Sequence, residues 1–81
     1  MHYVYLIRSK ISPDQTYIGD TDDLKARIKA RNNGQGGTTA KSKPWKLETY
    51  LAFSGKKQAL DFEAYLKSGS GHAFARKRLW S

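Results

Sequence analysis

Residues 16–19 read Thr16-Tyr17-Ile18-Gly19, and Arg27 follows eight residues after the glycine. Aromatic and β-branched residues favour a strand, and glycine is a common point at which regular structure breaks. Thr21 is a candidate helix N-cap, which puts Asp22 and Asp23 in the first helical turn, where carboxylates complement the helix dipole. This stretch therefore predicts a short strand, a turn and a helix that carries the arginine.

A first strand is expected from His2 to Arg8, a segment rich in aromatic and branched side chains. Both of its faces are apolar, with Tyr3, Tyr5 and Ile7 on one and Val4 and Leu6 on the other. We therefore expect it to be the central strand of a sheet. A turn over residues 9–15 joins it to the strand at residues 16–19 as a hairpin. That hairpin is expected to bring Tyr5 and Tyr17 within reach of one another.

The helix after Thr21 is expected to run to about Asn32, where Asn-Asn-Gly stops it. Leu24 and Ile28 lie one turn apart and define its buried line. Arg27 and Arg31 form a parallel line about 60° round the helix. Arg27 is thus expected on the shoulder of the packed face, near the sheet.

The second half of the chain predicts a loop, a strand and two helices. Residues 34–43 contain three glycines and no bulky apolar side chain, which indicates a mobile loop. A third strand is expected from Trp45 to Phe53, with helices over Lys56–Lys67 and Gly71–Trp80 and Ser70 as the cap of the last helix. In the strand, one face is expected to carry Trp45, Leu47, Thr49 and Leu51.

A carboxylate falls inside the apolar stripe of the helix over Lys56–Lys67. That stripe consists of Ala59, Phe62 and Leu66, and Glu63 lies one turn from Ala59. Glu63 is therefore expected to point towards the packed side. In the last helix, Phe74 and Leu79 are expected inward and Arg76, Lys77 and Arg78 largely outward.

With 81 residues, the chain is expected to form one domain, spanning residues 1–81, with a small core. It has no cysteine, and its two histidines, His2 and His72, are too far apart for a zinc motif. No signal-peptide pattern or long apolar run is present, so a soluble protein is expected.

Fifteen Lys and Arg against seven Asp and Glu give a net charge of +8. Such a charge on so small a body implies a positive field that attracts polyanions, which makes nucleic acid the first partner to consider. The alternative is that the charge serves solubility alone. Residues 41–81 carry nine Lys and Arg against three acids, so the second half is expected to offer the anion-binding surface.

Tyr5, Tyr17, Arg27 and Glu63 are candidates for one site at an edge of the sheet. Hydrolysis of a phosphodiester needs a hard cation held by a carboxylate, a positive charge for the developing negative charge, and a base for the attacking water. Each residue also has an ordinary interpretation. The tyrosines can be core aromatics, Arg27 can pair with Asp22 or Asp23, and Glu63 can pair with a basic neighbour.

Several motifs together resemble the GIY-YIG nuclease superfamily, and in particular its small stand-alone bacterial members. These motifs are Tyr3-Val4-Tyr5, Tyr17-Ile18-Gly19, Arg27 ten positions after Tyr17, Glu63 in the later helix, Asp23-Leu24-Lys25, Lys43-Pro44-Trp45-Lys46-Leu47, and the tail from Phe62 to Arg78.

The resemblance implies an α+β fold, a small three-stranded antiparallel sheet flanked by about three helices, and metal-dependent DNA cleavage. By the same resemblance, Tyr5 matches the general base and Tyr17 the tyrosine that aligns the water. Arg27 matches the arginine that stabilises the phosphate transition state. Glu63 matches the glutamate that binds Mg²⁺ or a similar ion such as Mn²⁺.

Two positions depart from the family pattern. Tyr3 stands where the first motif has glycine, as is common in the small members. Arg31 stands where similar nucleases place a histidine or tyrosine that touches the active site. Arginine stays protonated near neutral pH and cannot act as a base there, although it can grip a phosphate. We assign nucleic-acid binding to Arg31 and to the lysines that flank the glycine-rich loop, namely Lys41, Lys43 and Lys46.

The expected function is a divalent-metal-dependent DNA endonuclease, structure-directed or weakly sequence-specific, in DNA repair or recombination. We expect a monomer in the bacterial cytoplasm near the nucleoid, with no membrane partner and no small-molecule cofactor. One alternative is a catalytically weak or inactive nucleic-acid-binding domain on the same fold. Another is a protein-interaction module that uses an exposed Trp80 tail.

Overall fold

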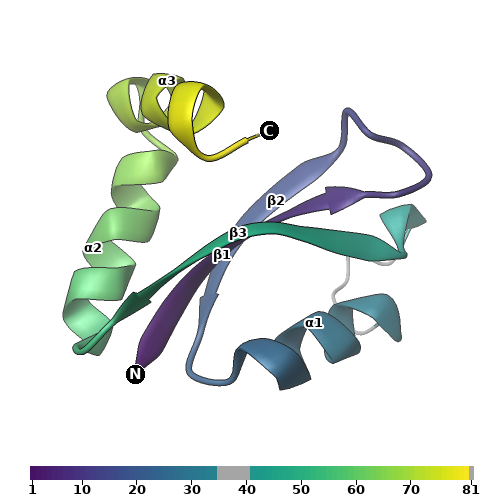
Figure 1. Cartoon of the computed structure of the whole chain (residues 1–81), viewed down its shortest axis with the longest axis horizontal. Coiled ribbons are helices and arrows are strands. Elements are labelled where there is room, and N and C mark those ends of the chain that lie inside the picture. The colour runs from purple at the N-terminus through teal and green to yellow at the C-terminus, as the bar shows by residue number, and fades with distance from the viewer. Residues whose placement is uncertain (35–40, 81) are drawn as a thin grey trace.

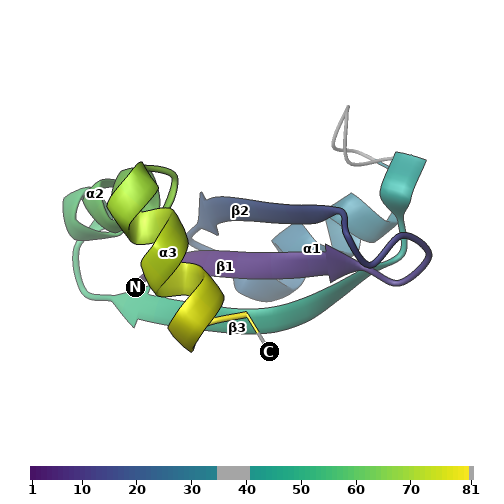
Figure 2. The same ribbon diagram turned by 90° about the horizontal axis from the view of Figure 1, so that it is seen from above.

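A three-stranded antiparallel sheet forms the middle layer of the computed structural model, which describes residues 1–34 and 41–80. β1 (His2–Ser9) lies between β2 (Thr16–Thr21) and β3 (Trp45–Phe53), as Figure 2 shows. The central position expected for β1 from its two apolar faces is confirmed. β2 continues to Thr21, past Gly19, where the sequence predicted its end.

Helices cover both faces of this sheet (Figures 1 and 2). α1 (Leu24–Asn32) packs on the face that carries Tyr5, whereas α2 (Lys56–Leu66) and α3 (Gly69–Arg78) pack on the face that carries Val4. The expected α+β fold is therefore confirmed. Within the described residues, no helix is both long enough and apolar enough to cross a bilayer.

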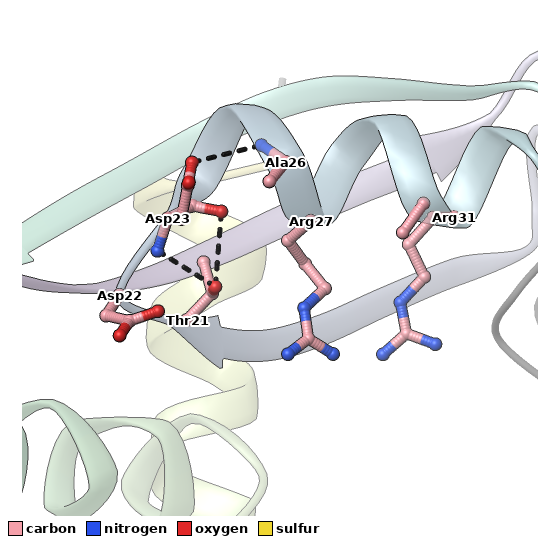
Figure 3. Close-up of a pocket in the computed structure, with 7 residues that line it drawn as sticks. Thr21, Asp22, Asp23, Ala26, Arg27 and Arg31 are labelled. Atoms are coloured by element: carbon pink, nitrogen blue, oxygen red, sulfur yellow. Dashed lines mark hydrogen bonds between the residues drawn. The ribbon is translucent and has the colours of Figure 1, made fainter.

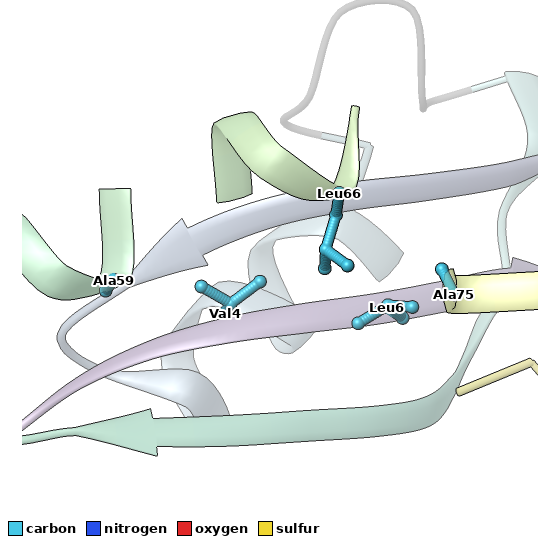
Figure 4. Close-up of a cluster of buried hydrophobic side chains, with 5 residues drawn as sticks. All are labelled: Val4, Leu6, Ala59, Leu66 and Ala75. Atoms are coloured by element: carbon cyan, nitrogen blue, oxygen red, sulfur yellow. The ribbon is translucent and has the colours of Figure 1, made fainter. Parts of the chain in front are cut away.

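Two apolar clusters, one on each face of β1, form the core. The cluster under α2 and α3 consists of Val4, Leu6, Ala59, Leu66 and Ala75 (Figure 4), and the cluster under α1 consists of Tyr5, Ile7 and Trp45. The side chains of β1 alternate between the two clusters and are fully buried from Val4 to Ile7. Because one strand contributes to both clusters, burial on the two faces fixes its register.

A β-bulge in β3 overturns the expected alternation of that strand. The pairing with β1 shifts between Leu6 and Ile7 and leaves Glu48 as the extra residue. As a result Leu47 packs in the cluster under α1, and Leu51 packs against the cluster on the opposite face. The prediction that Trp45, Leu47, Thr49 and Leu51 share one face is therefore wrong.

The C-terminal end of the chain packs back against the sheet. Trp80 is half-buried against the cluster under α2 and α3, and the Arg8 guanidinium lies 5.3 Å from the centre of its ring system. Arg8 Nε also donates a hydrogen bond of 3.1 Å to Oε1 of Glu48, whose side chain is 6% exposed. The expectation of an exposed Trp80 tail is thus wrong, because the indole covers core residues.

The N-terminus of α1 differs from the predicted cap. Asp23 is the N-cap, and its Oδ1 accepts a hydrogen bond of 3.1 Å from the Ala26 amide. Thr21 Oγ1 instead accepts from the Asp23 amide at 3.1 Å and lies at the end of β2. Neither Asp22 nor Asp23 is therefore in the first helical turn, because the helix begins at Leu24.

α3 begins two residues earlier than predicted, at Gly69 rather than Gly71, because Ser68 rather than Ser70 is its N-cap. The side chains of α3 that face the sheet also differ from the prediction. Ala75 is buried, whereas Phe74 is 39% exposed, so the expectation of an inward Phe74 is wrong. A Cβ built at Gly71 would lie 1.7 Å from the carbonyl oxygen of Tyr65, so the corner between α2 and α3 requires glycine at that position.

Candidate active site

Tyr5 and Tyr17 come together across the β1–β2 pair, as the hairpin predicted. Their ring centroids are 6.3 Å apart, and Tyr5 lies opposite Gly19 in the register. A Cβ at Gly19 would lie 2.6 Å from the Tyr5 hydroxyl oxygen and 2.9 Å from Cε2 of Tyr17. The bare backbone of Gly19 therefore leaves the space in which the buried Tyr5 ring extends over β2.

Arg31 joins the two phenols. Its Nη2 donates hydrogen bonds of 3.4 Å to the Tyr5 hydroxyl and 3.2 Å to the Tyr17 hydroxyl. Its guanidinium carbon lies 4.7 Å from the centroid of the Tyr17 ring. Burial raises the pKa of Tyr5, and the hydrogen bond and charge of Arg31 oppose that increase without cancelling it. The position that departs from the family pattern thus donates a hydrogen bond to the candidate base.

Arg27 lies one turn before Arg31 and points to the same side of α1 (Figure 3). Both arginines line a pocket of 410 Å³, together with Thr21, Asp22, Asp23, Ala26 and Ala30. Arg27 is more exposed than Arg31. In the part of the chain that the structure describes, it makes no ion pair with Asp22 or Asp23. The expected position on the shoulder of α1 thus leaves its guanidinium accessible.

Glu63 approaches from the opposite face of the sheet, on α2. Its side chain is 14% exposed, and its Oε2 accepts a hydrogen bond of 2.8 Å from Lys67 Nζ. Ala59 and Leu66 are buried on the same helix, as the apolar stripe predicted. Pairing of Glu63 with a basic neighbour was one interpretation of the sequence. Lys67, one turn along the helix, is that neighbour. Burial, followed by a hydrogen bond with Asp20, raises the pKa of Glu63.

Asp20 is the residue of this site that the sequence did not single out. Its carboxyl group hydrogen-bonds Glu63 and accepts from His2, and these two contacts lower its pKa. The distance between His2 Nε2 and Asp20 Oδ2 is 2.7 Å. Strand periodicity was the available signal, because Asp20 shares the α2 face of β2 with the apolar Ile18.

The two halves of the site meet at β2, the edge strand. Lys67 Nζ, which contacts Glu63, also lies 6.0 Å from the centroid of the Tyr17 ring. On the side of β2 that faces α2 and α3, a second pocket of 220 Å³ is lined by Thr16, Tyr17, Ile18, Lys67, His72 and Trp80. Tyr5 and the arginines thus lie on one side of β2 and the carboxylates on the other, and Tyr17 lies between these two groups.

The three lysines assigned to nucleic-acid binding are exposed. Lys41 and Lys43 lie at the end of the mobile loop predicted over residues 34–43, of which residues 35–40 lie outside the described part of the chain. Lys43 Nζ lies near Gly34, just after α1. Lys46 lies on β3 opposite Arg8, on the sheet edge away from β2. Their role in binding stays a prediction.

The donor set beside Glu63 suits a hard divalent cation. Glu63 on α2 and Asp20 on β2 offer carboxyl oxygens, and oxygen ligands are those that Mg²⁺ and Mn²⁺ prefer. Among residues 1–34 and 41–80, no group of three or more His, Cys, Asp and Glu side chains is arranged to hold a metal. An ion bound at Glu63 would therefore complete its coordination with water and substrate oxygens.

A family model described as the GIY-YIG catalytic domain matches residues 1–77. The match covers almost the whole chain, so the chain belongs to the GIY-YIG family. Membership implies nuclease activity with DNA as the substrate, and nucleases of this family generally use divalent metal ions.

Two small bacterial proteins illustrate the relationship. UPF0213 protein CPE1444 of Clostridium perfringens is 38% identical over 68 residues, which are 83% of this chain and 71% of that protein. UPF0213 protein YazA of Bacillus subtilis is 34% identical over 67 residues, which are 82% of this chain and 66% of that protein. The matched region thus spans about two thirds of the length of these relatives, and their names assign no activity.

Proposed function

We propose that the protein is a divalent-metal-dependent DNA endonuclease that hydrolyses phosphodiester bonds in DNA repair or recombination, as a monomer in the bacterial cytoplasm near the nucleoid. The supporting observation is the convergence at β2. Tyr5, Tyr17 and Arg31 meet on one side of this strand, and Glu63 meets Asp20 on the other.

The nucleic-acid backbone would lie along the outer edge of β2. Cationic side chains flank this edge on both sides, with Arg27 and Arg31 in one pocket and Lys67 in the other. Such cations position phosphates without reading bases. Cleavage would therefore follow DNA structure or show weak sequence preference, and exposed Lys41, Lys43 and Lys46 would add phosphate contacts further along the substrate.

Tyr5 would act as the general base. A phenolate at Tyr5 would take a proton from the attacking water, and Arg31, which donates to the same oxygen, would stabilise that phenolate against the effect of burial. The Tyr17 hydroxyl would align the water. Arg27, exposed in the adjoining pocket, would neutralise charge that develops on the phosphate oxygens.

Glu63 would hold the divalent ion. When bound there, Mg²⁺ or Mn²⁺ would supply positive charge for the phosphate and the leaving oxygen. The protein's own contribution is to keep the Glu63 carboxyl at the β2 edge, fixed by burial of Ala59 and Leu66 on the same helix. The ammonium of Lys67 would have to yield the carboxyl oxygen to the ion.

One observation favours the alternative of a domain that binds nucleic acid with weak or no cleavage. Burial raises the pKa of Tyr5, and the hydrogen bond from Arg31 opposes that increase without cancelling it. A phenol that stays protonated at neutral pH is a poor base. In that case the arginines would serve phosphate binding alone.

A cleavage assay separates these two functions. Supercoiled, linear and branched DNA would be incubated with the protein in Mg²⁺, in Mn²⁺ and in chelator, with Glu63→Ala and the matched control Asp61→Ala. Asp61 lies on the same helix but is 68% exposed and pairs with Lys57. We expect metal-dependent nicking that falls at least about 100-fold in Glu63→Ala, because metal stabilisation amounts to several kcal/mol, and is unchanged in Asp61→Ala.

Nicking that survives Glu63→Ala would contradict the assigned metal ligand. Tight, salt-sensitive binding without nicking would support the binding function instead, and absence of both at low salt would refute the nucleic-acid proposal. Arg31→His would then show whether this position limits cleavage. A rise in rate would identify arginine as the limitation, whereas an unchanged or lower rate would show that arginine suffices.

A further inference from the structure

We propose that Asp20 is a second carboxylate ligand of the divalent cation at Glu63 and that His2 holds it in place. This inference rests on the proposed metal-dependent function and adds a residue to it. Mg²⁺ is commonly bound through one or two carboxylates plus waters and substrate phosphate. A site with two carboxylates would meet that requirement more fully than Glu63 alone.

The backbone places Asp20 next to α2. Asp20 pairs with Val4 in the β1–β2 register, and Val4 belongs to the cluster that α2 covers. Side chains alternate along a strand, so Asp20 faces α2 while Gly19 faces Tyr5. Glu63 is 14% exposed on α2 and faces the same side of the sheet, so carboxyl groups from two different elements adjoin there.

His2 fixes the orientation of Asp20. It lies on β1, diagonally across from Asp20, and it is 9% exposed. Its Nε2 is 2.7 Å from Asp20 Oδ2. This contact engages Oδ2 of the Asp20 carboxyl group. A partner that orients a ligating carboxylate in this way is a usual part of a metal site.

Lys67 already occupies the position of a cation in this group. Its ammonium lies 2.8 Å from Glu63 Oε2, and its charge also acts on Asp20. The Lys67 side chain is 51% exposed, so it can turn outward without unpacking the core. Two carboxyl groups in contact repel one another when both are ionised. A divalent ion would offset that repulsion more fully than one ammonium.

The competing explanation is that Asp20 only pairs with His2 and repels the Glu63 charge. The two explanations predict opposite effects of Asp20→Asn, which keeps the size of the side chain and its hydrogen-bonding capacity. If Asp20 is a ligand, the substitution weakens metal binding. If Asp20 only repels Glu63, the substitution leaves metal binding unchanged or strengthens it.

The test is titration of the whole chain with Mn²⁺ alone, without DNA, followed by electron paramagnetic resonance of the free ion. We expect Asp20→Asn to weaken Mn²⁺ binding at least about tenfold, since loss of even a partner that orients a ligand costs that much. Glu63→Gln should weaken it at least as much, and Lys67→Met should strengthen it. Asp61→Asn is the matched control and should leave it unchanged.

A second measurement needs no variant. The side-chain carboxyl carbon resonances of Asp20 and Glu63 in the unmodified protein should both move during a titration with Mg²⁺. Metal affinity that is retained in Asp20→Asn, or a Glu63 resonance that moves while that of Asp20 does not, would overturn the inference and leave the proposed function intact. Absence of any Mn²⁺ binding to the unmodified protein without DNA would also overturn the inference, whereas the proposed function is refuted only by the cleavage assay.

Discussion

Gly19→Ala tests whether the Tyr5 and Tyr17 phenols must occupy their present positions. The added Cβ would lie 2.6 Å from the Tyr5 hydroxyl oxygen, 2.7 Å from its Cζ and 2.9 Å from Cε2 of Tyr17. Ordinary van der Waals contact begins at 3.4 Å, so the Tyr5 hydroxyl must retreat by about 0.8 Å. Misplacement of a reacting group by about 1 Å can reduce a rate about 100-fold.

We therefore expect Gly19→Ala to lower the rate of DNA nicking about 100-fold while metal binding at Glu63 is retained. The free energy of unfolding should fall by about 1–3 kcal/mol, as for other overpacked sites. Nicking of plasmid DNA and urea denaturation would measure the two effects. Gly69→Ala is the control, because a Cβ there has no atom within 4 Å. A Gly19→Ala protein that cleaves at the normal rate would refute the role of the phenols.

Two further predictions concern the helical corner and the base. Gly71→Ala should lower the free energy of unfolding, measured by urea denaturation, by about 3 kcal/mol or more. The reason is that the added Cβ would lie 1.7 Å from the backbone oxygen of Tyr65, which cannot rotate away. Stability equal to that of the unmodified protein would contradict this packing. With Tyr5 as the base, the reactive form is the deprotonated one and its pKa is raised. The cleavage rate should therefore rise about tenfold per pH unit between about pH 7 and 9, and a flat profile would exclude Tyr5 as the base.

The sheet was predictable because its signal is local. β1 alternates aromatic and branched side chains on two apolar faces, and either face alone indicates a buried strand. The bulge at Glu48 was not predictable in the same way. It appears only when the register of β3 against β1 is known, and no residue within β3 marks the point at which the alternation changes faces.

The candidate site was partly predictable for a related reason. Glu63 interrupts the apolar stripe of one helix, so local periodicity was enough to single it out. Asp20 carries only a weaker mark, its alternation with Ile18 on one face of β2, because an acid on an edge strand is ordinary. The role proposed for Asp20 depends on its contacts with Glu63 and with His2, which lies 18 residues before it in the sequence. Both contacts exist only in the folded chain. Arg31 was located by resemblance, but its hydrogen bonds to both phenols required the structure.

The position of β2 at the sheet edge explains why one short strand can serve both halves of the site. A central strand is covered on both faces and bonded on both sides, so groups on its two faces cannot reach a common ligand. Along the open edge of β2, however, Tyr17 from one face comes within 6.0 Å of Lys67, which lies beside Glu63 on the other. Gly19 lets the Tyr5 ring extend over this strand from the centre of the sheet. Unpaired strand edges promote aggregation. Binding of a substrate backbone along the edge of β2 would explain why this edge is left open.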